Sequence, residues 1–172
     1  MKIPGAAHTC VISIFVFLVA TLVESSILSN IMILPTVPDI CLLCLLYISI
    51  QNGRLFGETM GFVSGLFLDF LGSGILGLNC LYRTLIGYLG GFFNKTFNTE
   101  GIFIPILLGG IATVAKGLFL WLISLLFPHG TYSLFNKIFL FEVAENIILA
   151  PFVFKFLGLF RKSLIIKSEN VM

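Results

Sequence analysis

Residues 61–79 read GFVSGLFLDFLGSGILGLN, and they carry a single charged side chain, Asp69, among apolar residues and glycines. Glycines precede it at intervals of four residues, at Gly57, Gly61 and Gly65. At helical spacing, Asp69 is the next position on the same stripe. Small residues at this spacing let two membrane helices approach closely. The stretch therefore predicts a membrane helix whose packing face ends in a carboxylate.

The composition of the whole chain supports a membrane location. Of its 172 residues, 58% are hydrophobic and only 10% are charged, and the mean hydropathy is +1.10. Soluble domains carry roughly 25% charged residues. At about 20 residues per helical span, the chain has room for five or six spans. We therefore predict an integral membrane protein with no soluble catalytic domain.

Hydropathy and helix-breaking residues divide the chain into six predicted spans within one polytopic membrane domain, residues 1–172. The approximate ranges are 8–28, 38–50, 55–71, 75–93, 102–127 and 139–160. The second span begins at Pro38 and Asp39, a proline and an acid typical of a helix start. The turn Gly72-Ser73-Gly74 separates the third span from the fourth. The predicted fold class is an all-α membrane bundle of six transmembrane helices.

Charged residues in the loops predict the orientation of these spans. With the N-terminus inside, six cations fall on the inner side, and only Lys137 falls on the outer side. The six are Lys2, Arg54, Lys95, Arg161, Lys162 and Lys167. Because basic loops stay in the cytoplasm, both termini are expected there. The acids gather in the opposite, outer half, at Glu24, Asp39, Asp69, Glu142 and Glu145.

Two further cations, Arg83 and Lys116, lie deep within the fourth and fifth spans. An unpaired cation at that depth costs at least about 2.5 to 3.5 kcal/mol. We therefore expect both to face protein and to pair with acids of the outer half. The predicted intramembrane polar network has Asp69, Arg83, Lys116 and Glu145 as its core members. In the alternative, each charge snorkels separately to the nearest interface.

The glycines predict a helix-packing groove. On the third span it contains Gly57, Gly61, Gly65 and Asp69, and on the fourth span it contains Gly87 and Gly91. Such a face can receive another helix of the same bundle or the helix of a partner protein. Both interpretations remain open from the sequence.

No catalytic constellation is present in the sequence. The chain lacks the H-E-x-x-H, G-x-x-x-x-G-K and G-x-S-x-G motifs. Its four cysteines, Cys10, Cys41, Cys44 and Cys80, lie in apolar runs and are interpreted as packing residues. We predict no enzyme activity, no cofactor and no metal. A transporter stays possible, because intramembrane charges and glycine-broken helices can line a solute site.

Residues 38–93 resemble the rod shape-determining membrane protein family MreD. The resemblance begins with Pro38-Asp39 opening a short span, and continues with the run G-x-x-x-G-F-x-x-G-L-x-x-D that ends at Asp69. Further features are Gly72-Ser73-Gly74, Leu76-Gly77 and Leu85-Ile86-Gly87-Tyr88. The length of the chain, the number of spans and the short basic C-terminal tail also fit.

The resemblance implies a multi-pass protein of the bacterial inner (cytoplasmic) membrane that acts as a scaffold of the elongation (Rod) machinery. The implied direct partner is an MreC-like single-span protein. MreB, RodA and a class B penicillin-binding protein are indirect partners in lateral peptidoglycan synthesis. Membrane lipid is also expected to bind, and nucleic acid is not. The family fold is similar to the S components of energy-coupling-factor transporters, which keeps a vitamin-binding transporter as the alternative function.

Overall fold

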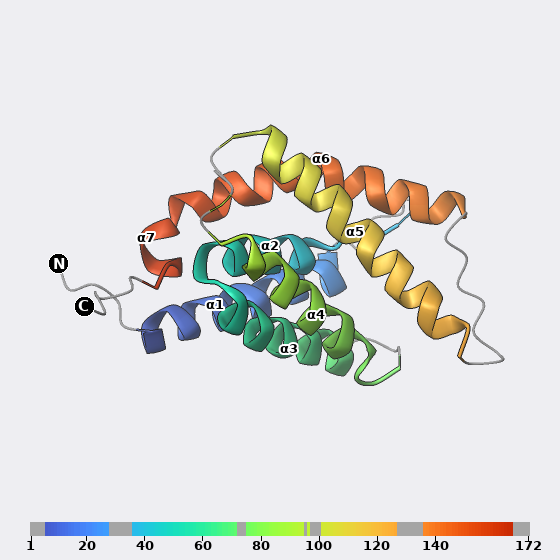
Figure 1. Ribbon diagram of the computed structural model, residues 1–172, viewed down its shortest axis with the longest axis horizontal. Helices are drawn as coiled ribbons and strands as arrows, with labels where there is room; N and C mark the ends of the chain where they lie inside the picture. The colour runs from blue at the N-terminus through green and yellow to red at the C-terminus, as the bar shows by residue number, and fades with distance from the viewer. Residues whose placement is uncertain are drawn as a thin grey trace.

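The computed structural model describes residues 6–27, 36–71, 75–94, 96, 101–126 and 136–166. Every regular element in these ranges is helical (Figure 1), which confirms the predicted all-α class. The elements are α1 (Ala6–Leu22), the π-helical turn η1 (Val23–Ile27), α2 (Ile40–Asn52), α3 (Arg54–Leu71), α4 (Leu78–Phe92), α5 (Phe103–Ser124), α6 (Lys137–Leu159) and α7 (Arg161–Leu164). Each of α1 to α6 lies within a few residues of a predicted span. The predicted glycine turn at 72–74 and the cations Lys2, Lys95 and Lys167 lie outside the described ranges.

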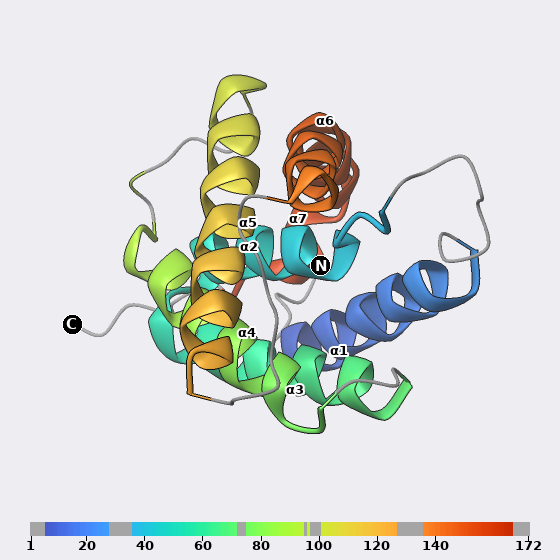
Figure 2. The ribbon, with the colours of Figure 1, turned by 90° about the vertical axis from the view of Figure 1, so that its right-hand side faces the viewer.

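Helix α2 occupies the centre of the bundle. All of its residues from Cys41 to Ile50 are buried, and it contacts α1, α3, α4, α5 and α6. Figures 1 and 2 show it between a layer of α1, α3 and α4 and a layer of α5 and α6. Its 13 residues span about 20 Å at 1.5 Å per residue. A helix this short is enclosed by its neighbours on every side.

The bundle has a buried hydrophobic core, but its surface is more apolar than the surface of a soluble protein. Large apolar side chains are exposed on α1, α3, α4, α5 and α6, and the exposed fraction reaches 87% at Phe103. Charged and polar side chains such as Asp39, Arg83 and Asn146 are instead buried. Soluble monomers rarely expose apolar surface on this scale. The segment Ala6–Ser26 and helix α5 are also long and apolar enough to cross a membrane.

The glycine face of α3 packs against the backbone of α4. A Cβ atom built at Gly57 would lie 2.3 Å from the carbonyl oxygen of Gly87. One at Gly61 would lie 2.3 Å from the carbonyl oxygen of Arg83. Any side chain at either position would therefore overlap the α4 backbone.

The remaining members of the predicted groove complete the same contact. A Cβ atom at Gly65 would lie 2.4 Å from the Cα atom of Cys80. One at Gly87 would meet Gly57, and one at Gly91 would meet the backbone of Gly53. The helix that fills the glycine face is thus the chain's own α4. The interpretation of this face as a docking site for a partner helix is wrong.

At the C-terminal end of α2, the side chain of Asn52 forms hydrogen bonds with the segment that contains α7. Its amide donates to the carbonyl oxygen of Leu164 in α7 at 2.8 Å, and its Oδ1 atom accepts from the N–H of Ile166 at 2.7 Å. Figure 1 shows α7 at the same end of the bundle as the start of α1. In the predicted orientation this is the cytoplasmic end.

We predict that Gly61→Leu lowers the free energy of unfolding by about 2 to 3 kcal/mol or more, because overpacking of this size forces the two backbones apart. Denaturant titration of the purified protein in detergent measures the change. Gly158→Ala is the matched control, because a Cβ atom there has no heavy atom within 4 Å. Equal stability of the Gly61→Leu variant and the unmutated protein would contradict the close α3–α4 contact.

Candidate functional site

Asp39 caps the N-terminus of α2. Its Oδ1 atom accepts from the N–H of Leu42 at 2.9 Å, which satisfies one of the free amides of the first turn. A carboxylate at this position also complements the positive end of the helix dipole. The Asp39 residue is only 1% exposed. Its charge must therefore be balanced inside the protein.

Two cations from other helices balance Asp39. Arg83 of α4 donates through Nη2 to Asp39 Oδ1. Lys116 of α5 donates through Nζ to Asp39 Oδ2 at 2.8 Å and to Glu142 of α6 at 2.7 Å. Asp39, Arg83, Lys116 and Glu142 are called the ion cluster below. It contains two carboxylates and two cations, so its formal charges cancel.

Neutral groups and one more acid complete the surroundings of the ion cluster. The amide oxygen of Asn146 accepts from the backbone N–H of Asp39 at 2.9 Å, and its amide nitrogen donates to Thr113 of α5 at 3.0 Å. Glu24 of η1 accepts from the backbone N–H of Cys41 at 3.2 Å. Chain segments from η1, α4, α5 and α6 thus converge on the start of α2.

The ring of Tyr82 lies beside both cations of the cluster. The guanidinium carbon of Arg83 is 5.4 Å from the ring centroid, and Lys116 Nζ is 5.8 Å from it. Such contacts are attractive through the ring quadrupole. The Tyr82 hydroxyl also accepts from Arg83 Nε at 3.1 Å. Among the buried side-chain atoms of the described residues, Arg83 Nη1 has no hydrogen-bond partner.

Asp69 binds the start of α4 and does not pair directly with Arg83. Its carboxylate accepts from the backbone N–H groups of Gly77 at 3.0 Å, Asn79 at 3.2 Å and Cys80 at 3.1 Å. It also accepts from the side-chain amide of Asn79 at 2.9 Å. The predicted direct Asp69–Arg83 pair is wrong, because the unsatisfied amides of a helix start attract the carboxylate instead.

A hydrogen-bond chain nevertheless connects Asp69 with the ion cluster. Asn79 Oδ1 accepts from the Tyr82 hydroxyl at 2.9 Å, and that hydroxyl accepts from Arg83. Asp69, Arg83 and Lys116 thus belong to one hydrogen-bonded network, in which Asn79, Tyr82 and Asp39 connect them. Glu145 is not among its members: it accepts from the hydroxyl of Thr36 at 2.6 Å.

The sequence contained signals for the members that were missed. Glu142 and Asn146 are four residues apart, so they share one face of α6. Glu145, one position before Asn146, lies about 100° around the helix from it. Asp39 was recognised as a helix start but was not assigned as a partner of Arg83.

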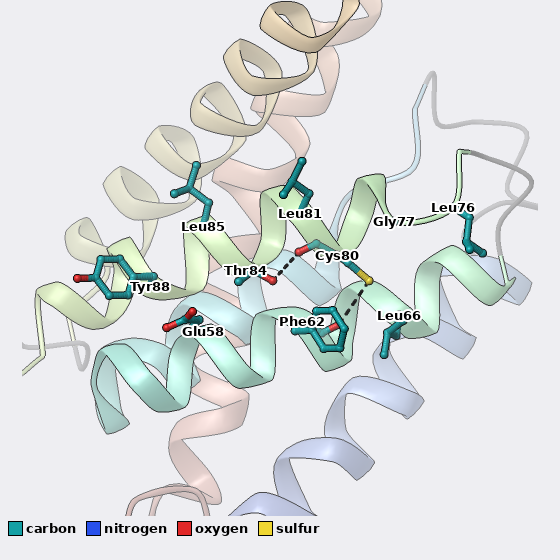
Figure 3. Close-up of a pocket in the computed structure, with 10 residues that line it drawn as sticks. All are labelled: Glu58, Phe62, Leu66, Leu76, Gly77, Cys80, Leu81, Thr84, Leu85 and Tyr88. Atoms are coloured by element: carbon teal, nitrogen blue, oxygen red, sulfur yellow. Dashed lines mark hydrogen bonds between the residues drawn. The ribbon is translucent and has the colours of Figure 1, made fainter.

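A groove runs along the outer side of the α3–α4 pair, and Figure 3 shows it. It encloses about 720 Å³. We call it the α3–α4 groove, and its walls include Glu58, Phe62, Leu66, Leu81, Leu85 and Tyr88. Polar groups at its base are satisfied within the chain, because Cys80 Sγ lies 3.7 Å from the carbonyl oxygen of Phe62, and the Thr84 hydroxyl donates to the carbonyl of Cys80. The surface that it offers is therefore mainly apolar.

Glu58 is the exception in the α3–α4 groove. It lies with Tyr88 at the end of the groove opposite Leu76 (Figure 3). It is half-buried, and none of the salt bridges within the described ranges involves it. In those same ranges, no group of histidine, cysteine, aspartate and glutamate side chains could hold a metal ion.

Comparison with known proteins identifies a family that the chain matches. The sequence model of a family described as rod shape-determining protein MreD matches residues 6–160. No curated protein and no solved structure matches the chain. The expected likeness to transporter S components therefore stays a prediction.

The ion cluster predicts which pairs of substitutions are coupled. Asp39→Asn and Arg83→Gln should each lower the free energy of unfolding by about 3 to 5 kcal/mol, because the first removes the acid that pairs with buried Arg83 and the second removes one of the two cations that balance buried Asp39. The double variant should show a coupling energy above about 1 kcal/mol, and this coupling should exceed that of Asp69→Asn with Arg83→Gln, which are connected only through Asn79 and Tyr82. Denaturant titration in detergent measures both cycles. A larger coupling for the Asp69 pair would overturn the assignment of partners.

Proposed function

The chain belongs to the MreD family of rod shape-determining proteins, and from that premise we propose that it is a non-catalytic membrane adaptor for an MreC-like single-span protein. Family membership already implies a membrane protein with a role in rod shape determination. The proposal adds a multi-pass topology in the inner membrane with both termini in the cytoplasm. Arg54 begins α3, and Arg161 and Lys162 begin α7. These helix starts lie at the end of the bundle where α1 begins (Figure 1), which supports this orientation.

The observation that carries the proposal is the α3–α4 groove. The glycine faces of α3 and α4 pack against each other. These inner faces are therefore not accessible to another helix. Their outer faces then present side chains at four-residue steps, Glu58, Phe62 and Leu66 on α3 and Leu81 and Leu85 on α4. Ridges and grooves at this spacing are the surface against which a third helix packs.

The charge of Glu58 specifies which helix fits. In the proposed orientation, Glu58 lies near the cytoplasmic end of α3, four residues after Arg54. Single-span membrane proteins carry lysine or arginine beside the cytoplasmic end of their helix. Such a residue would pair with Glu58 while the apolar helix packs along Phe62 and Leu81. This complementarity favours an MreC-like helix over a lipid chain as the occupant.

The ion cluster supports the adaptor over the transporter alternative. The carboxylates of Asp39 and Glu142 are taken by Lys116 and Arg83 within the chain. A solute site would require these groups to turn toward a ligand. Pairing of these groups with one another joins the helices that carry them, which is a structural role.

The other members of the elongation machinery are proposed as indirect partners. MreB would approach the basic cytoplasmic end, and RodA with a class B penicillin-binding protein would join through the MreC-like protein. The adaptor would in this way help to organise lateral peptidoglycan synthesis.

We predict that Leu81→Trp lowers the yield of the complex with a co-expressed MreC-like protein by about tenfold or more, because overpacking costs about 1 to 3 kcal/mol and each 1.4 kcal/mol corresponds to about a tenfold change in affinity. Affinity purification from membranes measures the yield. Leu107→Trp on α5 is the matched control, because Leu81 and Leu107 are 55% and 58% exposed.

Charge reversal gives a second arm of the same experiment. Glu58→Lys should reduce the yield, and a lysine-to-glutamate change beside the cytoplasmic end of the partner's helix should restore it. Full yield from Leu81→Trp together with loss from Leu107→Trp would move the interface away from the groove. Saturable binding of a vitamin-sized solute by the isolated protein, without a complex, would favour the transporter alternative.

A further inference from the structure

A second hollow lies where the start of α5 meets the last turns of α6. It encloses about 600 Å³, and we call it the α5–α6 hollow. Its lining comes from Tyr47 of α2, from Gly101 and Ile102 before α5, and from α6 and α7. The α6 and α7 residues are Pro151, Phe152, Phe154, Lys155, Gly158 and Arg161. Neither the ion cluster nor the α3–α4 groove shares any of these residues.

Aromatic and apolar side chains form the base of the α5–α6 hollow. Tyr47 and Phe154 contact each other edge to face, with ring centroids 5.4 Å apart. Each of them is only 1% exposed, so they close the hollow toward the core. Ile102 and Phe152 are 65% and 67% exposed, and they offer apolar walls that face outward. The inner part of the hollow therefore suits a hydrocarbon chain.

Two cations stand at one side of this apolar surface. Lys155 lies four residues before the end of α6, which is about 6 Å along the axis at 1.5 Å per residue. Arg161 begins α7 directly beyond that end, and Figure 1 shows α6 leading into α7 there. Both side chains are exposed, and no acid lines the hollow within the described ranges. The lining of the hollow thus combines two cations with apolar side chains.

We propose that the α5–α6 hollow binds one anionic phospholipid of the cytoplasmic leaflet. Its phosphate lies between Lys155 and Arg161, where a guanidinium and an ammonium both donate to phosphate oxygens. An acyl chain runs along Ile102 and Phe152. Free phosphate offers the same anionic oxygens as a phospholipid headgroup, but only the lipid would also bury an acyl chain against the apolar walls. The anionic headgroup gains from both cations, since basic residues near a membrane attract anionic lipid.

Only the choice of leaflet rests on the orientation proposed above. Retention of lipid by the protein in detergent does not depend on orientation or on an MreC-like partner. A failure of lipid binding would therefore leave the adaptor proposal standing, and a failure of the adaptor would leave the lipid site standing.

Native mass spectrometry of the delipidated full chain tests the site, with phosphatidylglycerol, phosphatidylcholine and inorganic phosphate added separately. We expect one phosphatidylglycerol to be retained at a concentration about tenfold lower than phosphatidylcholine. Lys155→Gln with Arg161→Gln should abolish the difference. Lys162→Gln should preserve it, because Lys162 is adjacent in α7 but does not line the hollow.

A steric variant separates loss of the site from loss of the fold. Gly158 lines the hollow, and a Cβ atom there has no heavy atom within 4 Å, so Gly158→Leu adds volume at the hollow where its Cβ atom has free space. Leucine also favours a helix over glycine, so stability should hold while lipid retention falls. Equal retention of the two lipids by the unmutated protein, unchanged retention by Gly158→Leu, or binding of inorganic phosphate in place of lipid would each overturn the proposal.

Discussion

The structure depends on the ion pairs that Asp39 makes at the start of α2. Association of helices in a membrane gains little from the hydrophobic effect, because lipid chains are as apolar as the helices themselves. Asp39 joins α2 to α4 through Arg83 and to α5 through Lys116, and Lys116 brings in α6 through Glu142. Removal of Asp39 takes away the carboxylate that pairs with buried Arg83, and an unbalanced buried charge is strongly destabilising. A short central helix is held in this way by the neighbours that enclose it.

The glycine contact and the ion cluster join different helices of the bundle. The stripe at Gly57, Gly61 and Gly65 brings the α3 and α4 backbones together, and the cluster fixes this pair against α5 and α6. The inner faces of α3 and α4 contact each other, and the opposite side of the pair, with the α3–α4 groove, is exposed and can contact another helix. The same construction leaves the last turns of α6 near the start of α5, where Lys155 and Arg161 are exposed. The proposed adaptor function would use such a centre with separate surfaces around it.

Local patterns allowed much of the fold to be predicted. Helix ranges follow from apolar runs and breakers, and the glycine stripe follows from a spacing of four residues. The need for Arg83 and Lys116 to find carboxylates followed from the free energy of a buried charge. Which carboxylates they find depends on tertiary packing. Asp69 is near Arg83 in sequence, but its carboxylate accepts from the backbone amides at the start of α4. On α6, the packing places Glu142 beside Lys116 and Glu145 beside Thr36. The occupant of the glycine face was open because one pattern serves internal and external packing equally.

Hydrogen–deuterium exchange of the α2 amides, in detergent, tests the central claim most directly. In the unmutated protein, residues 41–50 should exchange more slowly than those of any other helix, because a buried central element opens only with the whole bundle. In Asp39→Asn, protection of α2 should fall together with protection of the α4, α5 and α6 segments that bear Arg83, Lys116 and Glu142. Exchange of α2 at the rate of α5 in the unmutated protein, or α2 protection unchanged by Asp39→Asn, would contradict the account.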